Sequence, residues 1–226
     1  PGITGIRSFK GHSFHTSRWD YGYTGGDTNG GLVKLRNKRV AIIGTGATAI
    51  QAVPHLGRWA KQLYVFQRTP SAVDSRGNRK TDPAWARSLQ PGWSQHRREN
   101  FDTVVKGLPF DTDLVHDGWT EINRRVKARL AAIPQDQLTM DEAMRIREIE
   151  DYRFMSGLRD RVDEIVIDKE TADKLKAWYR WQCKRPTFND DYLPTFNRPN
   201  VTLVDVSATK GVERITERGL VANGVE

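Results

Sequence analysis

The hydrophobic pattern first predicts a β-α-β unit. An apolar run at residues 39–43, bounded by a lysine and a glycine, is typical of a strand covered on both faces. Apolar residues then recur at helical spacing over about residues 47–59, where Pro54 either kinks the helix or lies near its first turn. Residues 63–66 are apolar again and indicate a second strand. These two strands and the helix between them form the expected unit.

The apolar period changes to about 3.6 from Thr81 onwards. Four helix starts can be recognised, each a capping side chain ahead of an apolar stripe. The capping positions are Asp82 before Pro83, Asp117, Thr139 with Glu142, and Asp168. The block over residues 81–181 is therefore expected to be an all-helical insertion.

Strand character returns near the end of the chain. Residues 201–204 indicate a buried strand, and residues 212–216 and 220–222 indicate the edges of a small antiparallel piece. The turns that follow these two edges are expected at Gly219 and at Asn223-Gly224. The simplest arrangement returns these strands to the first sheet.

The sequence thus predicts one α/β domain with a Rossmann-like central sheet, interrupted by the all-helical insertion. Residues 32–80 and 182–226 would form the Rossmann-like domain, and residues 81–181 the insertion. Residues 1–31 are rich in aromatic, small polar and glycine residues, which is typical of a linker. The chain begins without a methionine and ends two residues after a hairpin signal. Those ends favour a piece of a longer protein, and a disordered tail is the alternative.

Charge and composition narrow the classes of function. The 226 residues carry 36 Lys plus Arg against 28 Asp plus Glu, a formal charge of +8 that could attract nucleic acid, acidic membrane or a phosphate-bearing ligand. Basic and acidic residues are interleaved from Arg97 to Lys176, as on solvated helix faces, which disfavours a nucleic-acid partner. The single cysteine, Cys183, permits no internal disulfide and points to a cytoplasmic setting.

The sequence gives no reason to expect a membrane partner or a metal. It contains no secretory signal and no apolar run of membrane-spanning length. His12, His55, His96 and His116 show no metal-ligand spacing, and with a single cysteine no zinc site is expected.

Residues 44–49 fit the dinucleotide-binding pattern G-x-G-x-x-A, between the first strand and the helix. Gly44 permits the tight turn, Gly46 lets the backbone approach a pyrophosphate, and Ala49 is small enough for close packing of helix on strand. The N-terminus of the helix then presents free N–H groups to the pyrophosphate.

The end of the second strand indicates which dinucleotide is bound. An NAD site usually has Asp or Glu there, but this chain has Arg68 and Thr69. A guanidinium and a hydroxyl suit the 2′-phosphate of NADP, which a carboxylate would repel. NADPH is therefore favoured over NADH, and Arg68 as an ordinary solvated residue is the alternative.

The segment Phe9–Asp20 matches F-x-G-x-x-x-H-x-x-x-W-[P/D] at every fixed position, and this string resembles the fingerprint of the flavin-dependent Baeyer-Villiger monooxygenases. Its fixed positions are Phe9, Gly11, His15, Trp19 and Asp20. Residues 65–70, 183–186 and 191–201 resemble the same family in the same order. The stretch from Lys184 to Val201 is similar to enzymes that act on large-ring or polycyclic ketones.

The resemblance implies residue roles and a reaction. It assigns Arg185 as the active-site arginine, beside a flavin peroxide whose anion a guanidinium can stabilise. The cofactor-binding positions expected from the loop and from the resemblance are Gly44, Thr45, Gly46, Ala47, Thr48, Ala49, Gln51, Arg68, Thr69 and Lys184. In such enzymes NADPH reduces FAD, O₂ adds, and a ketone becomes an ester or lactone. FAD would be held mostly by an FAD domain outside this chain, so the chain alone is expected to be inactive.

Several alternatives stay open from the sequence. Lys184 and Arg185 could be an ordinary basic pair, and His15 and Trp19 are more readily explained by a structural or conformational role than by catalysis. A related flavin monooxygenase that oxidises nitrogen or sulfur, and a non-catalytic basic binding module, are the competing functions.

Overall fold

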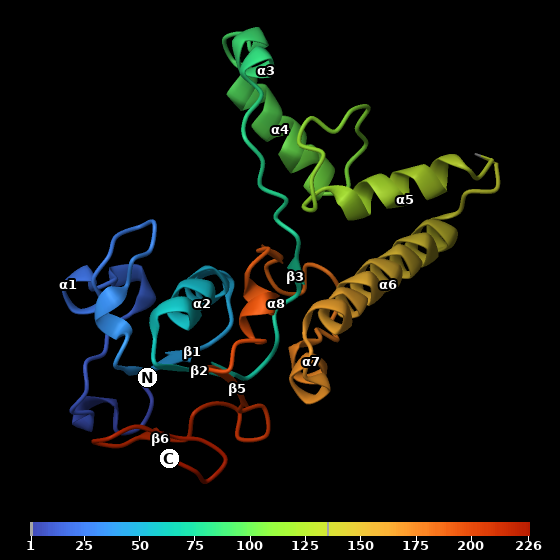
Figure 1. Cartoon of the computed structure of the whole chain (residues 1–226). Helices are drawn as coiled ribbons and strands as arrows, with labels where there is room; N and C mark the ends of the chain where they lie inside the picture. Colours follow the sequence, from blue (N-terminus) through green and yellow to red (C-terminus); the bar gives the residue numbers. More distant parts are fainter. Residues whose placement is uncertain (1, 135) are drawn as a thin grey trace. The chain divides into compact units, whose positions relative to one another are not determined.

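The computed structural model describes residues 2–134 and 136–226 and contains a parallel β-sheet built on the expected β-α-β unit (Figure 1). Strand β1 (Arg39–Ile43), helix α2 (Ala47–Trp59) and strand β2 (Gln62–Gln67) follow one another along the chain. Strand β5 (Val201–Asp205) joins them, so the strand order is β1-β2-β5, with both pairs parallel. The structure is thus of mixed helix and sheet.

The chain divides into two compact units. One comprises the residues up to Val73 together with Leu158–Glu226, and the other comprises Asp74–Gly157. The first unit contains the sheet. Its other elements are the short 3-10 helices η1 (Ile6–Ser8), η2 (Thr16–Arg18) and η3 (Val33–Leu35), helices α1 (Tyr21–Thr24), α7 (Lys169–Leu175) and α8 (Tyr192–Thr195), and strands β4 (Thr187–Phe188), β6 (Arg214–Ile215) and β7 (Leu220–Val221).

The second unit is helical. It contains α3 (Pro83–Ser88), α4 (Trp93–Val105), α5 (Glu121–Ala131) and the first part of α6 (Met140–Ile165). The short strand β3 (Val73–Asp74), which pairs with β4, lies at the boundary in sequence between the units. Among the described residues, no helix combines the length and apolarity needed to cross a membrane.

The core of the first unit forms where α2 packs on the sheet and on α8 (Figure 1). Val53 of α2 and Leu63 and Val65 of β2 are fully buried. Burying one such side chain stabilises a fold by roughly 1.5–3 kcal/mol. The C-terminal end of α2 is also satisfied, because Asn200 Nδ2 donates to the carbonyls of Gly57 at 3.0 Å and Ala60 at 2.8 Å.

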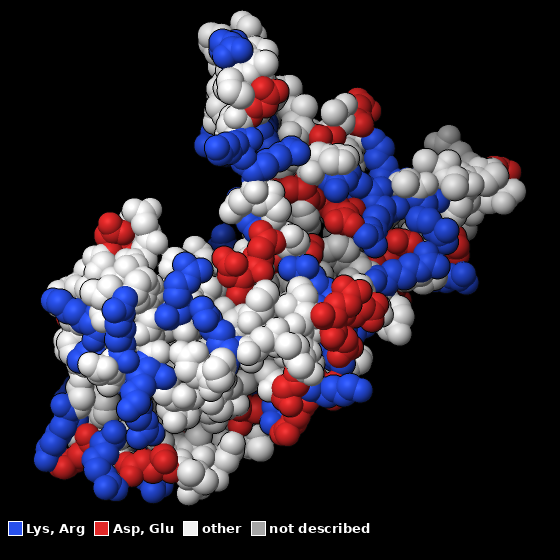
Figure 2. Space-filling view, in the orientation of Figure 1, with Lys and Arg blue, Asp and Glu red and all other residues white. Residues whose placement is uncertain are grey.

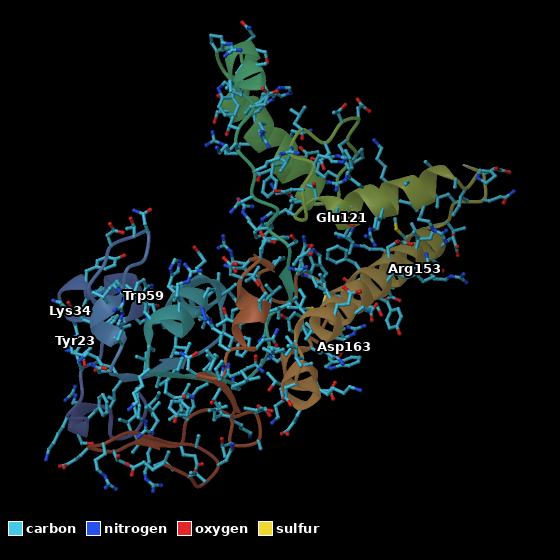
Figure 3. The ribbon with its side chains drawn as sticks, viewed as in Figure 1. Tyr23, Lys34, Trp59, Glu121, Arg153 and Asp163 are labelled. Atoms are coloured by element: carbon cyan, nitrogen blue, oxygen red, sulfur yellow. The ribbon has the colours of Figure 1, made fainter. Side chains whose placement is uncertain are left out.

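Two of the side chains labelled in Figure 3, Asp163 and Arg153, make local contacts in the two units. Asp163 on α6 accepts a hydrogen bond from Lys176 Nζ at 2.7 Å, within the first unit. In the second unit, Arg153 Nη1 donates to the buried Glu150 at 2.7 Å. On the face shown in Figure 2, basic side chains lie among acidic ones on both units, as the interleaved sequence indicates.

Most local predictions of helix and strand are confirmed. Asp82 caps α3 and Asp168 caps α7, each through a backbone N–H at 2.8 Å. The Glu142 N–H donates to Thr139 Oγ1 at 3.2 Å at the start of α6. Pro54 lies inside α2 rather than in its first turn.

One predicted helix start was wrong, and one helix was missed. Asp117 caps a turn by accepting from the Trp119 N–H at 2.9 Å, and α5 begins only at Glu121. Helix α4 was missed because its N-cap is Gly92, with φ 87° and no side-chain hydrogen bond to mark the start.

The prediction that all late strands rejoin the first sheet was also wrong. Strand β5 does so, but within the described residues β6 and β7 form a separate antiparallel pair. The Ile215 N–H of β6 donates to Thr4 O of the N-terminal segment at 2.8 Å. The turn at Asn223-Gly224 is confirmed, with φ of 53° and 75°.

Gly57 in α2 should resist substitution by alanine. A Cβ there would lie 2.7 Å from Thr195 Cγ2 and 3.2 Å from Val201 Cγ2, whereas a Cβ at Gly157 in α6 meets no atom within 4 Å. We expect Gly57→Ala to lower the free energy of unfolding by about 1–3 kcal/mol through overpacking. Gly157→Ala should raise it by about 0.5–1 kcal/mol through helix propensity. Thermal and urea denaturation followed by circular dichroism measure both, and equal effects would contradict the packing described for α2.

Candidate functional site

The glycine loop between β1 and α2 is open on its outer side. Gly44 has a φ of 98°, which favours glycine, and its N–H donates to Phe66 O at 2.8 Å. Gly46 is the N-cap of α2 and has an extended backbone that any residue can adopt. A Cβ at either glycine would meet no atom within 4 Å. The fold itself therefore does not require glycine at position 46. A ligand bound against the loop would require it, because a side chain there would occupy the space of the ligand.

Thr45 ties the glycine loop to the segment that follows β2. Its side chain is buried, and Oγ1 donates to the carbonyl of Thr69 at 3.0 Å. Ser71 Oγ in turn donates to the carbonyl of Thr45. Because these bonds run in both directions, the start of α2 and the end of β2 hold a fixed separation. Ser71 was not singled out in the sequence.

The remaining residues predicted from the loop lie on α2. Thr48 is exposed on the first turn, and Ala47 beside it is partly exposed. Gln51 is also exposed, and its Nε2 donates to the Ala47 carbonyl at 3.0 Å within the helix. Ala49 is buried in the core cluster, as close packing of helix on strand requires.

A cavity of about 590 Å³ opens at the carboxyl ends of β2 and β5. Arg68 and Thr69 line it from the end of β2, and Asp205 and Ser207 from the end of β5. The segment from α7 to Tyr179 forms the opposite wall. Binding sites of parallel sheets typically lie at this edge.

Lys184 lies close enough to Arg68 for their charges to interact, and their two segments are joined at a bridge between Ala72 and Thr187. At that bridge the Thr187 N–H and Oγ1 donate to the Ala72 carbonyl at 3.3 and 2.7 Å. Removal of water by the surrounding protein lowers the pKa of Lys184, and the positive charge of Arg68 lowers it further. The structure thus brings together two like charges, which an anion would stabilise. Lys184 is not among the residues that line the cavity.

Arg185 is exposed and follows Lys184 directly. The predicted active-site arginine is therefore adjacent to Lys184 in sequence.

The fingerprint residues form a local cluster of packed rings and caps. A Cβ at Gly11 would lie 2.4 Å from Phe9 Cζ, so the phenylalanine ring covers the glycine. Trp19 Nε1 donates to Thr24 Oγ1 at 3.1 Å, and the indole packs against the core of the first unit. His15 Nδ1 accepts from the Ser17 N–H at 3.2 Å.

Asp20 closes this cluster. It caps α1 by accepting from the Tyr23 N–H at 2.9 Å, and this hydrogen bond is the main cause that lowers the pKa of Asp20. Its other oxygen lies 2.8 Å from His12 Nε2, and the His12 ring stacks on Tyr23 at 3.9 Å between centroids. His12 stands at a variable position of the fingerprint, so the motif alone could not identify it.

No protein-family profile matches the chain. Individual known proteins are similar to it along its whole length. The chain is 56% identical to neopentalenolactone D synthase of Streptomyces avermitilis, over all of this chain and 38% of that protein. It is 53% identical to Baeyer-Villiger monooxygenase ATR8 of Stachybotrys chlorohalonatus, over all of this chain and 36% of that protein. The chain therefore spans less than two fifths of the length of these relatives.

Solved structures are similar to the chain as well. The polycyclic ketone monooxygenase of the fungus Thermothelomyces thermophila matches with a TM-score of 0.84 and 44% identity, over 99% of this chain and 36% of that chain. A structure of OTEMO in complex with FAD and NADP matches with a TM-score of 0.69 and 28% identity, over 100% of this chain and 42% of that chain.

Proposed function

We propose that this chain is the NADPH-binding part of a Baeyer-Villiger monooxygenase. The premise is its similarity, along its whole length, to part of such enzymes. The observation that carries the proposal is the neighbouring pair Arg68 and Lys184 at the end of β2, close to a glycine loop with open space in front of it. We propose that the pair binds the 2′-phosphate and that the loop binds the pyrophosphate.

We propose further that the sheet with α2 is a Rossmann-like NADP-binding domain. The parallel β1-α2-β2 unit and the return of β5 beside β2 support this. Residues 32–80 and 182–226 would form that domain, with residues 81–181 as the helical insertion and residues 1–31 as the linker that carries the fingerprint. Helices α3 to α7 lie within residues 81–181, which supports a helical insertion, although the end of α6 and α7 belong to the same compact unit as the sheet.

The proposed NADPH site fits the residues that are present. A side chain at position 46 would extend into open space, which is where a pyrophosphate would contact the backbone. Thr45, Thr48 and Gln51 lie on or beside this loop, and Thr69 is fixed to it through Thr45. The nicotinamide and FAD would supply the redox chemistry when bound, with FAD held mostly by segments outside this chain.

The chain's own residues would bind, orient and stabilise charge. Arg68 and Lys184 would hold one end of NADPH by charge. The guanidinium of Arg185 would stabilise an anion that develops beside it. We propose that the complete enzyme inserts one oxygen atom of O₂ into a ketone to give an ester or lactone. The comparisons offer no support for an N- or S-oxidising enzyme or for a nucleic-acid-binding module.

Replacement of Gly46 by alanine should separate folding from binding. Gly46→Ala introduces no clash in the protein, so the melting temperature should stay the same. NADPH and NADH affinities should each fall by about tenfold or more, because both share the pyrophosphate. Isothermal titration calorimetry measures both. Unchanged binding would contradict a pyrophosphate at this loop, and Gly44→Ala, which strains a φ of 98°, provides the contrasting case of lost stability.

NADPH affinity should fall as the pH rises through the lowered pKa of Lys184. That pKa lies below 10.5, and only the protonated amine attracts a phosphate, so the loss begins at a lower pH than for an ordinary lysine. Titrations from roughly pH 7 to about 10 follow it, with NADH as the reference that lacks the 2′-phosphate. Lys184→Arg keeps its charge over this range and should flatten the profile. A profile that Lys184→Arg leaves unchanged would assign the titration to another group.

Arg185→Ala in the full-length protein should uncouple the two halves of the reaction. Oxidation of NADPH, followed as bleaching of flavin absorbance, should survive, since Arg185 is not part of the proposed phosphate site. Formation of lactone from a cyclic ketone should fall by about 100-fold or more, as for removal of a charge-stabilising donor. Loss of NADPH binding with intact oxygenation after chemical reduction of the flavin would show that the role assigned to Arg185 is wrong.

A further inference from the structure

Tyr179 joins the two segments that carry the proposed 2′-phosphate site. It lies between α7 and β4, is partly buried, and lines the cavity together with Arg68 and Thr69. Its hydroxyl oxygen accepts a hydrogen bond from the Ala72 N–H at 2.8 Å. The ammonium of Lys184 lies 5.5 Å from the centre of its ring.

The hydroxyl contact fixes the backbone that follows Thr69. Both polar groups of the Ala72 peptide unit are engaged, because the N–H bonds Tyr179 and the carbonyl accepts from Thr187. The segment from Arg68 to Ala72 is therefore held at both of its ends, by the Thr45 bond to Thr69 and by these two contacts.

The ring contact explains how Lys184 stays near Arg68. Two like charges repel, and the neighbourhood already lowers the pKa of Lys184. The face of an aromatic ring carries partial negative charge and attracts an ammonium group at this distance. Burial raises the pKa of Tyr179, so its hydroxyl stays neutral and does not repel a nearby phosphate.

We propose that Tyr179 is a positioning residue for the 2′-phosphate site, and that it thereby contributes to the choice of NADPH over NADH. Its ring holds the Lys184 ammonium beside Arg68, and its hydroxyl fixes the segment that presents Arg68 and Thr69. This inference rests on the proposed function, because it concerns the same site. Tyr179 would act only on binding of the 2′-phosphate, which NADH lacks. It would therefore change the ratio of the affinities for NADPH and NADH.

The neighbouring Trp178 provides a matched control. It lines the same cavity and is 75% exposed, but the cation over its ring, at 4.4 Å, is Arg159 rather than Lys184. Trp178→Leu removes an aromatic ring next to Tyr179 without touching the Lys184 contact. Its effect on NADPH and on NADH should be equal.

The experiment measures the affinities of the full-length protein for NADPH and for NADH by isothermal titration. Tyr179→Leu removes the ring and the hydroxyl and should weaken NADPH binding by about tenfold, with NADH binding unchanged. Tyr179→Phe keeps the ring and should weaken NADPH binding by only about threefold. In a Lys184→Ala background, the further effect of Tyr179→Leu should shrink to that of Tyr179→Phe, because the ring then has no cation to position.

Arg68→Ala separates failure of this inference from failure of the proposed function. If the unmodified protein prefers NADPH and Arg68→Ala removes the preference, the site is correct, and Tyr179 variants that keep the preference overturn only the role of Tyr179. Equal losses of NADPH and NADH binding would also overturn it, since a structural defect acts on both. If the unmodified protein shows no preference and Arg68→Ala changes nothing, the proposed function fails and this inference with it.

Discussion

The main physical constraint at the carboxyl end of β2 is the repulsion between two neighbouring positive side chains, Arg68 and Lys184. Arg68 follows β2 and Lys184 precedes β4, and the pKa of Lys184 is lowered first by burial and then by the positive charge of Arg68. A protein gains nothing in stability from such a pair by itself. The surrounding contacts, from Thr45 to Thr69 and from Thr187 and Tyr179 to Ala72, keep the segments in place against this repulsion. In the proposed site, the phosphate of the ligand would offset this repulsion.

The glycine loop and the cationic pair act through one short segment. Thr69 and Ser71 contact Thr45, which is the residue between the two loop glycines. A ligand that spans the loop and the pair would therefore meet two parts of one hydrogen-bonded frame. The fingerprint region supports that frame indirectly, since Trp19 packs against the core that also contains Val53 of α2. This geometry agrees with a structural role for Trp19, which the sequence favoured.

Local signals in the sequence predicted more of the structure than long-range ones did. The β-α-β unit and the caps at Asp82 and Asp168 depend on residues a few positions apart, so pattern and capping chemistry sufficed. Helix α4 has only Gly92 at its start, and glycine offers no capping side chain to recognise. The antiparallel pairing of β6 with β7 was predicted, but their separation from the first sheet was not, because the hydrogen-bond partner of Ile215, Thr4, lies at the other end of the chain.

The candidate site divides in the same way. Gly44, Gly46 and Arg68 follow from the motif and its spacing. Lys184 and Arg185 came only from resemblance to a family, because nothing in their own composition distinguishes them from a surface pair. Tyr179 carried no signal at all: its partner Ala72 is 107 positions away, and the block around it had been assigned to helix.

The side chain of Asn200 has a consequence for the order in which the chain can fold. It satisfies the last carbonyls of α2 from 140 positions away, just before β5 pairs with β2. Helix α2 and strands β1 and β2 can form early. The free edge of β2 and the last carbonyls of α2 gain their partners only when residues 200–205 have been synthesised. Contacts of such long sequence separation form slowly. While the intervening helical block is synthesised, the nascent sheet therefore consists of β1 and β2 alone.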